Sequence, residues 1–449
     1  MADSPAPSPD LIHDVVTAAL RAGADAAEAV TAQRTSLSVG VRDGALEDVE
    51  REESHDLGLR VFVGKRQATV STSDLSAPTR ARLIERAVAM ARLAPEDPYA
   101  TLAPEDRLAR GPFRDLDLYD DSFPEPLALE TAARDCEASA LGVAGVARSE
   151  GGHASASRSA WRLVTSHGFD GQYRGTAFSL GAGVIAEKDG AMERGGEHRT
   201  LRHLSDMPSA ESLGLEAGRR AVARVGARKI ASRTLPVIFE NRVATQVLSP
   251  LLGAMSGPSI ARGTSFLKDA LGEVVLPAHL SLIDDPFRTR GLGSTPFDDE
   301  GVEVVERALV DQGVITTWLM NTAAAAQLGL ASTGHASRGL AGPSGVSTHN
   351  LHLTPGETDL QGLMGQADTG LLVTSMFGPS LNPNTGDWSA GVSGFFFEGG
   401  QITHPVSEVT VAGNLRALWT RMVAGSDLEF RSSFNSPSLL IDGVAVAGK

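Results

Sequence analysis

A helix, a run of alternating strands and a second helix occupy the start of the chain, in an arrangement that the sequence then repeats. Apolar residues recur at helical spacing from Asp10 to the stop at Gly23, and a second helical pattern covers residues 77–93. Between them apolar and polar residues alternate, as in half-buried strands. Helices that flank antiparallel strands pack on one face of the sheet. The pattern predicts an α+β unit over residues 1–94.

The second copy of this arrangement follows a break. A helix is predicted over residues 127–141, alternating strands over 154–187 and an Ala-rich amphipathic helix over 209–225. The Pro-rich, charged stretch 95–126 is predicted to be a linker. We infer an architectural duplication, in which residues 127–228 form a second α+β unit.

The remaining residues, 229–449, have a mostly-β pattern. An apolar strand over 235–239 and a helix containing Leu248 come first, and strand-like alternation dominates from Leu276 onward. Frequent Gly suits strongly bent sheets. Hairpin turns are predicted at Asp299-Glu300-Gly301, Asp311-Gln312-Gly313 and Glu398-Gly399-Gly400. The predicted fold class is therefore α+β, with two helix/antiparallel-sheet units followed by a β-rich, barrel-like domain that walls a cavity.

Composition argues against several classes of function. The formal net charge is −15 and no dense run of Lys and Arg appears, which argues against a nucleic-acid partner. No run approaches the roughly 20 apolar residues of a membrane span, and residues 1–10 lack the basic and apolar regions of a signal peptide. The single Cys136 cannot form an internal disulfide, and the carboxylates of Asp135 and Glu137 would raise its pKa. A cytoplasmic protein without a thiol nucleophile is expected.

Several motifs in the C-terminal half are distinctive. They are Arg262-Gly263-Thr264-Ser265, the Gly- and Phe-rich run 382–400, Pro405-Val406-Ser407-Glu408 and the segment 411–415. Together they resemble the TldD/PmbA family of bacterial and archaeal proteins. The resemblance implies a two-subunit zinc metalloprotease whose subunits are related to each other.

The resemblance also indicates a subunit type. In the TldD type, a His-Glu-x-x-x-His helix precedes the Arg-Gly-Thr-Ser motif, and a Cys near the C-terminus is the third zinc ligand. Alignment on that motif places Leu248, Ser249 and Gly253 at the His, Glu and His positions, and residues 430–449 contain no Cys. The chain is therefore similar to the PmbA (TldE) type. This resemblance implies no catalytic residue and no metal in this chain, with zinc expected in the TldD-type partner.

The eleven His residues give no clear metal motif. Glu197 and His198 lie in a Gly- and Arg-rich hairpin, for which a solvated loop is predicted. His349 and His352 are three apart in an extended segment, so their side chains are expected on opposite faces. His335 lies in a loop predicted to face the cavity and is a candidate contact to peptide or partner, although a lone His is more often structural.

Two acidic runs, Asp284-Asp285 and residues 298–301, invite a metal or acid–base interpretation. Paired catalytic carboxylates need a particular separation and shifted pKa values, which the sequence does not reveal. The second run resembles a segment found in both subunit types of the family. A structural hairpin is therefore predicted there.

The run 382–400 supplies the remaining contact candidates. Asp387 and Ser389 can hydrogen-bond a peptide or partner chain, and a satisfied turn is the alternative. Trp388 is a candidate interface anchor. Phe396 is the middle one of three consecutive Phe residues, which must divide between the two faces of a strand.

We interpret the chain as a PmbA/TldE-like, non-catalytic subunit of a heteromeric zinc metalloprotease that cleaves unfolded or small modified peptides. The TldD-type partner would supply the zinc, and this chain the other wall of a closed chamber in which extended peptide is held by strand addition. Two alternatives stay open: an autonomous metallopeptidase with unrecognised ligands, and a homodimeric peptide-binding regulator with a gyrase-modulator-type role. The isolated chain could form a homodimer through the surface meant for its partner.

Overall fold

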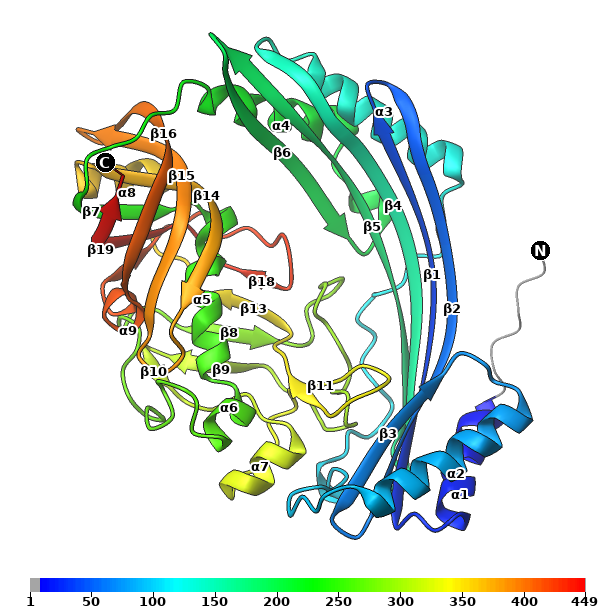
Figure 1. Cartoon of the computed structure of the whole chain (residues 1–449). Coiled ribbons are helices and arrows are strands. Elements are labelled where there is room, and N and C mark those ends of the chain that lie inside the picture. Colours follow the sequence, from blue (N-terminus) through cyan, green and yellow to red (C-terminus); the bar gives the residue numbers. More distant parts are fainter. Residues whose placement is uncertain (1–8, 449) are drawn as a thin grey trace.

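The computed structural model describes residues 9–448 (Figure 1). Its N-terminal half contains one six-stranded antiparallel sheet in the order β3-β2-β1-β4-β5-β6. The strands are β1 (Ala26–Arg42), β2 (Ala45–Val63), β3 (Arg66–Thr72), β4 (Val146–Thr165), β5 (Asp170–Lys188) and β6 (Ala191–Leu201). The two predicted units thus contribute three consecutive strands each to a single sheet.

The two sets of strands meet at β1 and β4, which pair from Glu28 opposite Thr165 to Val41 opposite Gly152. Each set has a helix before it and a helix after it. These helices are α1 (Pro9–Arg21), α2 (Ala77–Leu93), α3 (Pro126–Leu141) and α4 (Ala210–Arg224). The predicted order of helix, strands and helix is confirmed in both copies, but the sequence did not reveal that they build one continuous sheet.

Side-chain alternation along β1 assigns the two faces of this sheet. Odd-numbered residues such as Ala29 and Val39 are buried beneath the helices. Even-numbered Glu28 and Val30 are buried on the other face, where Glu28 pairs with Arg338 of the C-terminal half. Figure 1 shows the C-terminal half on the concave side of the curved sheet.

The segment between α2 and α3 packs between the two halves. It includes a short 3₁₀ turn, η1 (Glu105–Arg107), and several of its apolar side chains are buried. The backbone N–H of Thr176 donates to the carbonyl of Leu118, and the N–H of Ala109 donates to the carbonyl of Gly301. The predicted linker is therefore a packed connection that joins the sheet to the C-terminal half.

The C-terminal half contains a closed five-stranded barrel, which confirms the barrel-like prediction. Its strand order is β16-β15-β14-β7-β19, and pairing of β16 with β19 closes it. The strands are β7 (Arg233–Phe239), β14 (Gly370–Leu381), β15 (Asp387–Glu398), β16 (Gln401–Asn414) and β19 (Leu439–Ala447), with β17 (Met422–Ala424) paired to β19. Helices α5 (Asn241–Ala254), α8 (Leu360–Ala367) and α9 (Leu415–Trp419) pack on the barrel.

A second five-stranded sheet, in the order β10-β9-β8-β13-β18, belongs to the same half. Its strands are β8 (Leu282–Asp285), β9 (Arg307–Asp311), β10 (Val314–Ile315), β13 (Asn350–Leu353) and β18 (Phe434–Asn435). The small pair β11 (Ala336–Ser337) and β12 (Gly345–Val346), the helices α6 (Gly257–Ala261) and α7 (Thr322–Leu328) and the 3₁₀ turn η2 (Leu204–Asp206) complete the elements.

Two of the three predicted hairpin turns are confirmed. Gln312-Gly313 joins β9 to β10, and Gly399-Gly400 joins β15 to β16. The hairpin predicted at residues 299–301 is wrong, because no strand flanks that turn on either side. The Asp298 carboxylate holds the turn instead, since it accepts the backbone N–H groups of Glu300 and Val302.

The division of the chain at residues 94, 126 and 228 remains our proposal for its domains.

Within residues 9–448, no helix combines the length and the apolar character that crossing a bilayer requires.

Candidate functional site

Helix α5 has two contrasting faces, and the outer one carries the candidate site. The inner face is buried in the core of the barrel and consists of Val243, Ala244, Val247, Leu248, Leu251 and Ala254. Arg242, Gln246, Ser249 and Gly253 are spaced by four, three and four positions, so they form one stripe on the opposite face. In Figure 1, α5 lies on the side of the barrel that faces the long sheet.

The three residues at the aligned positions of the His-Glu-x-x-x-His motif fall on both faces. Leu248 is fully buried. Ser249 is exposed, and its hydroxyl donates to the carbonyl of Thr245 in the same helix at 2.7 Å. Gly253 is exposed and has open space beside it. Protein ligands of zinc are imidazole, thiolate and carboxylate groups, so these residues do not fit the ion.

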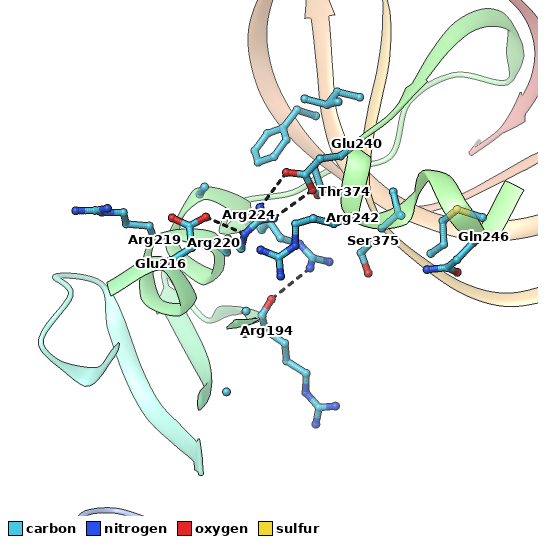
Figure 2. Close-up of a pocket in the computed structure, with 18 of the residues that line it drawn as sticks. Arg194, Glu216, Arg219, Arg220, Arg224, Glu240, Arg242, Gln246, Thr374 and Ser375 are labelled. Carbon is cyan, nitrogen blue, oxygen red and sulfur yellow. Dashed lines mark hydrogen bonds and ion pairs between the residues drawn. The ribbon is translucent and has the colours of Figure 1, made fainter. Parts of the chain in front are cut away.

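A pocket of about 680 Å³ opens beside the first turns of α5 (Figure 2). Its walls come from both halves of the molecule: β4, β5, β6 and α4 on one side, and α5, β14 and β15 on the other. Arg242 and Gln246 of the α5 stripe line it, together with Phe395 of β15. The volume lies in the range of sites that bind small ligands or peptide segments.

Arginine dominates the charge of this pocket. Five arginines line it, Arg194, Arg219, Arg220, Arg224 and Arg242, against three glutamates, Glu150, Glu216 and Glu240. Arg220 bonds two of these glutamates, Glu216 at 2.9 Å and Glu240 at 2.9 and 3.2 Å. The excess of guanidinium groups contrasts with the net charge of −15 of the whole chain.

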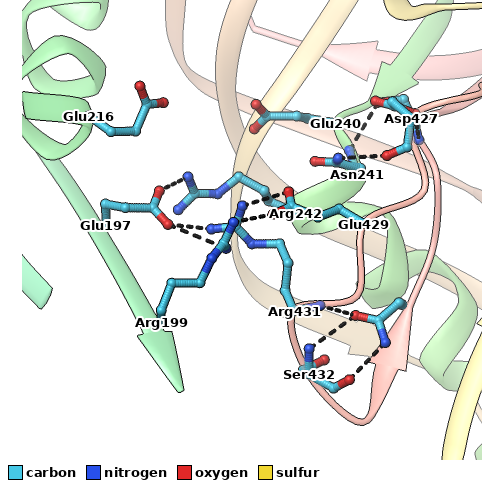
Figure 3. Close-up of polar contacts among 12 residues, drawn as sticks. Glu197, Arg199, Glu216, Glu240, Asn241, Arg242, Asp427, Glu429, Arg431 and Ser432 are labelled. Atoms are coloured by element: carbon cyan, nitrogen blue, oxygen red, sulfur yellow. Dashed lines mark hydrogen bonds and ion pairs between the residues drawn. The ribbon is translucent and has the colours of Figure 1, made fainter. Parts of the chain in front are cut away.

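Beside the pocket, Glu197 of β6 joins the two halves of the molecule (Figure 3). Its carboxylate bonds Arg242 of α5 and Arg431 near the C-terminus, and it lies 3.6 Å from Arg199 and 3.8 Å from Arg220. Glu197 is 4% exposed, so the solvated loop predicted around it is wrong at this position. Guanidinium groups from distant segments surround this carboxylate. No local sequence pattern predicts these contacts.

A separate polar cluster is buried where β8 meets the segments that precede β11 and β13. The Oδ2 atom of Asp284 lies 3.0 Å from Nε2 of His335 and 2.7 Å from Nδ1 of His349. The exposed fractions are 0%, 1% and 7%, respectively, so the group is closed to solvent. The sequence gives no sign that these three residues meet, because only the pairing of β8 with β13 brings His349 beside Asp284.

This cluster is the one place in residues 9–448 where three His, Cys, Asp or Glu side chains converge closely enough to hold an ion. Two imidazoles and a carboxylate are a donor set that zinc accepts. Each histidine already bonds Asp284, however, and Nδ1 of His335 lies 2.8 Å from the hydroxyl of Thr333. The group is also enclosed, whereas a catalytic zinc needs an open position for water and substrate. An ion bound here would have a structural role.

Hydrogen bonds and electrostatic attraction within the cluster determine its charge. Burial would raise the pKa of Asp284, but the bonds from His335 and His349 outweigh it and hold this pKa below its ordinary value. Burial lowers the pKa of His335, despite its bond to Asp284, which favours a neutral ring. The arrangement is an ionised carboxylate between imidazole donors.

The prediction that His349 and His352 point apart agrees with the packing of His352 against Phe430.

The acidic turn at residues 298–301 packs against the His335 segment. Asp298 accepts the N–H of Ala336, and Asp299 accepts the N–H of Arg338. Burial raises the pKa of Asp299 to about 6. Burial, with the nearby charge of Glu300, raises the pKa of Asp298 well above its ordinary value. These carboxylates build the turn and its contacts, which is a structural role.

The aromatic contact candidates lie inside the barrel. Trp388 is 4% exposed and packs edge-on against Phe239. Phe396 is buried, and the guanidinium of Arg233 lies 5.1 Å from its ring centroid. In residues 9–448 as folded here, neither ring is placed to anchor a surface contact, so any contact role for them remains a prediction.

The polar candidates on the same strand are nearer the surface. Asp387 is exposed, and its carboxylate accepts from the hydroxyl of Thr385 and the amide of Asn414, as in the satisfied turn. Ser389 is partly buried. Neither residue lines the α5 pocket, to which this strand contributes Phe395 instead. Their proposed contact with peptide or partner also remains a prediction.

Cys136 lies in α3 and is fully buried. Burial raises the pKa of its thiol to about 12, with a smaller contribution from the charge of Glu197. The raised pKa agrees with the expectation that this thiol is not activated, although burial is the main cause rather than its sequence neighbours.

Comparison with known proteins identifies the family. Models of the PmbA/TldA metallopeptidase family match residues 27–91 (domain 1), 117–225 (central domain) and 232–448 (C-terminal domain). The metalloprotease PmbA of Escherichia coli O157:H7 is 35% identical over 98% of this chain and 96% of its own.

Solved structures share the fold. A crystal structure from Bacteroides thetaiotaomicron, described as a candidate modulator of DNA gyrase, is 27% identical with a TM-score of 0.91 and 98% of each chain covered. TldE from Thermococcus kodakarensis is 21% identical with a TM-score of 0.87 over 98% of this chain and 100% of its own, which shows a common fold. By the family models and the identity to PmbA along almost its whole length, this chain belongs to the PmbA/TldD family of metallopeptidases.

Proposed function

We propose that this chain is the non-catalytic, PmbA/TldE-type subunit of a heteromeric zinc metallopeptidase that acts on unfolded or small modified peptides. The observation that carries the proposal is the outer stripe of α5. At the positions aligned with a metal-binding helix it presents Ser249 and Gly253, while Leu248 is turned into the core. A helix with this surface has no group that holds or polarises a metal ion.

The partner in this proposal is a TldD-type chain that supplies the zinc and its ligands. This chain contributes a wall of the chamber, in which the α5 pocket is available to substrate. Its mixed lining of arginine, hydroxyl and apolar groups suits a peptide better than a nucleic acid, which would need a much larger basic surface. A cytoplasmic location fits the single buried thiol and remains a prediction.

An autonomous metallopeptidase is the second candidate, because Asp284, His335 and His349 form a donor set that zinc accepts. The enclosure of that cluster counts against it, since substrate has no path to the donors. A homodimeric regulator of the gyrase-modulator kind is the third, and the acidic charge of the chain counts against direct contact with DNA.

The test is a peptidase assay with an unstructured peptide, performed with this chain alone, with a TldD-type chain from the same organism alone, and with both mixed in the presence of zinc. We expect turnover in the mixture and none with this chain alone. Metal analysis of the purified chain accompanies the assay. Turnover by this chain alone would overturn the proposal in favour of the autonomous enzyme. Failure of the two chains to associate, with peptide binding retained, would favour the homodimeric regulator.

A further inference from the structure

In the α5 pocket, the guanidinium groups of Arg224 and Arg242 leave most of their hydrogen-bond donors unused within residues 9–448. Arg220, Arg224 and Arg242 approach one another in its centre, from α4 and α5 (Figure 2). A guanidinium has five N–H donors. In the part of the chain that the structure describes, the guanidinium of Arg224 makes one hydrogen bond, from Nη1 to the carbonyl of Arg194 at 3.3 Å, and its nearest carboxylate, Glu193, is 3.7 Å away.

Most carboxylates beside these arginines are already engaged, since Arg220 bonds both Glu216 and Glu240. Arg242 shares the carboxylate of Glu197 with Arg431, while Arg199 and Arg220 lie within 4 Å of the same group. Arg199 and Arg431 also bond Glu429, which lies outside the pocket lining. Within the pocket, Arg224 and Arg242 each make one hydrogen bond to the described part of the chain and keep further donors free, so an anion placed between them would be stabilised by charge-assisted hydrogen bonds from both.

The opposite wall of the pocket suits the rest of a peptide. A bulge in β14 between Val373 and Ser375 interrupts pairing with β15, and Thr374 and Ser375 line the cavity there. The side-chain amide of Gln246 adds a further donor and acceptor. Leu372 and Phe395 supply an apolar surface beside them. The cavity thus places hydrogen-bonding and apolar groups next to a site for an oxyanion.

We propose that the α5 pocket binds a carboxylate of an extended peptide, held by Arg224 and Arg242 while the adjoining residues of the peptide contact Gln246, Ser375 and Phe395. Planar guanidinium groups match carboxylates with paired hydrogen bonds, which favours arginine for this task. The proposal takes its ligand class from the proposed function. It concerns binding by this chain alone, so it is tested without a partner subunit.

The experiment measures fluorescence anisotropy of three labelled, unstructured peptides with the full chain. The first has a free C-terminal carboxylate and no acidic side chain, the second is the same peptide with an amidated C-terminus, and the third is amidated but carries one Glu. We expect the first or the third to bind about tenfold more tightly than the second, the effect of one charge-assisted interaction. Which of the two binds distinguishes a terminal carboxylate from an acidic side chain.

Substitutions in α4 provide a matched pair. Arg224→Gln removes a central guanidinium and is expected to abolish the preference for the carboxylate, whereas Arg224→Lys retains part of it. Arg219→Gln is the control, because this arginine lies on the same helix and Figure 2 shows its guanidinium pointing away from the centre of the pocket. Thermal melts of all variants confirm that they are folded.

Equal affinity for the three peptides, or equal losses in Arg219→Gln and Arg224→Gln, would overturn the carboxylate site. Such a result would leave the partner-subunit proposal intact, since that proposal is tested by turnover in the mixture. Conversely, a carboxylate preference in a chain that gains no activity with a TldD-type partner would uphold the pocket and reject the subunit role.

Discussion

The guanidinium of Arg338 hydrogen-bonds the carboxylate of Glu28, a residue 310 positions earlier in the chain. Both side chains are almost completely buried, with exposed fractions of 0% and 1%. Arg60 adds a bond of 3.2 Å to the same carboxylate and lies 3.9 Å from Glu300. This buried group of charges joins the concave face of the long sheet to the C-terminal half.

Arg338→Ala should therefore destabilise the whole chain. Removal of one partner leaves buried carboxylates undercompensated, at a cost of about 3 kcal/mol in the free energy of unfolding. Urea denaturation measures the effect, with Arg34→Ala on the exposed part of β1 as the control. If Arg338→Ala loses no more unfolding free energy than the control, Arg60 alone is sufficient to compensate the charge of Glu28.

Asp299 should make stability depend on pH. Its pKa rises from an ordinary 3.8 to about 6 in the folded chain, mainly through burial. The folded state thus binds more protons than the unfolded state between these values, so stability falls as pH rises through this window and is constant above it. The shift corresponds to about 3 kcal/mol.

Asp299→Asn tests this directly, since the amide oxygen can still accept the N–H of Arg338. We expect the variant to melt at a higher temperature than the parent at pH about 8, with the difference shrinking as the pH falls to about 4. Differential scanning calorimetry across this range provides the measurement. A difference that does not change with pH would contradict the assignment.

The buried cluster around Asp284 should need no metal for its stability. Asp284→Asn replaces a carboxylate that accepts from two imidazoles and one backbone N–H, and should cost about 3 kcal/mol. We expect the same loss, and the same parent melting temperature, before and after extensive treatment with a chelator. A chelator-induced drop in the parent that is absent from Asp284→Asn would instead reveal a structural ion.

Restoration of the aligned metal-binding residues should not create a peptidase. In the triple variant Leu248→His, Ser249→Glu and Gly253→His, the first imidazole enters the barrel core, where a buried polar group without a partner costs about 1–3 kcal/mol. The third ligand and its supporting hydrogen bonds would still be missing. Peptide turnover with added zinc is the measurement, and Ser249→Glu alone is the control for the exposed face. Robust turnover by the triple variant would contradict the prediction.

Periodicity predicted much of the architecture because the long elements are regular. The helix expected over residues 77–93 is found at those positions, and the Gly-containing turns at 311–313 and 398–400 connect paired strands as predicted. Local chemistry determines each of these features: a repeating apolar face in the helix, and positive backbone angles at Gly313, Gly399 and Gly400.

Features that depend on distant segments were not predictable in this way. The sequence around Glu197 predicts a polar loop, yet guanidinium groups from α4, α5 and the C-terminal segment surround its buried carboxylate. His335 and His349 converge only through Asp284 on β8. Trp388 is a candidate interface anchor by its residue type, but its ring is buried in the barrel core. In each case the tertiary fold supplies the neighbours that set the role.

The continuous pairing of β1 with β4 determines whether the two copies in the sheet can fold as separate fragments. Because these strands pair along most of their length, the junction is a continuous row of main-chain hydrogen bonds rather than a hinge. A fragment carrying one copy would expose a long edge of unpaired N–H and C=O groups, a ready template for aggregation. We therefore expect the duplicated region to fold as one unit, so that truncation at the boundary between the copies yields insoluble polypeptides instead of two folded domains.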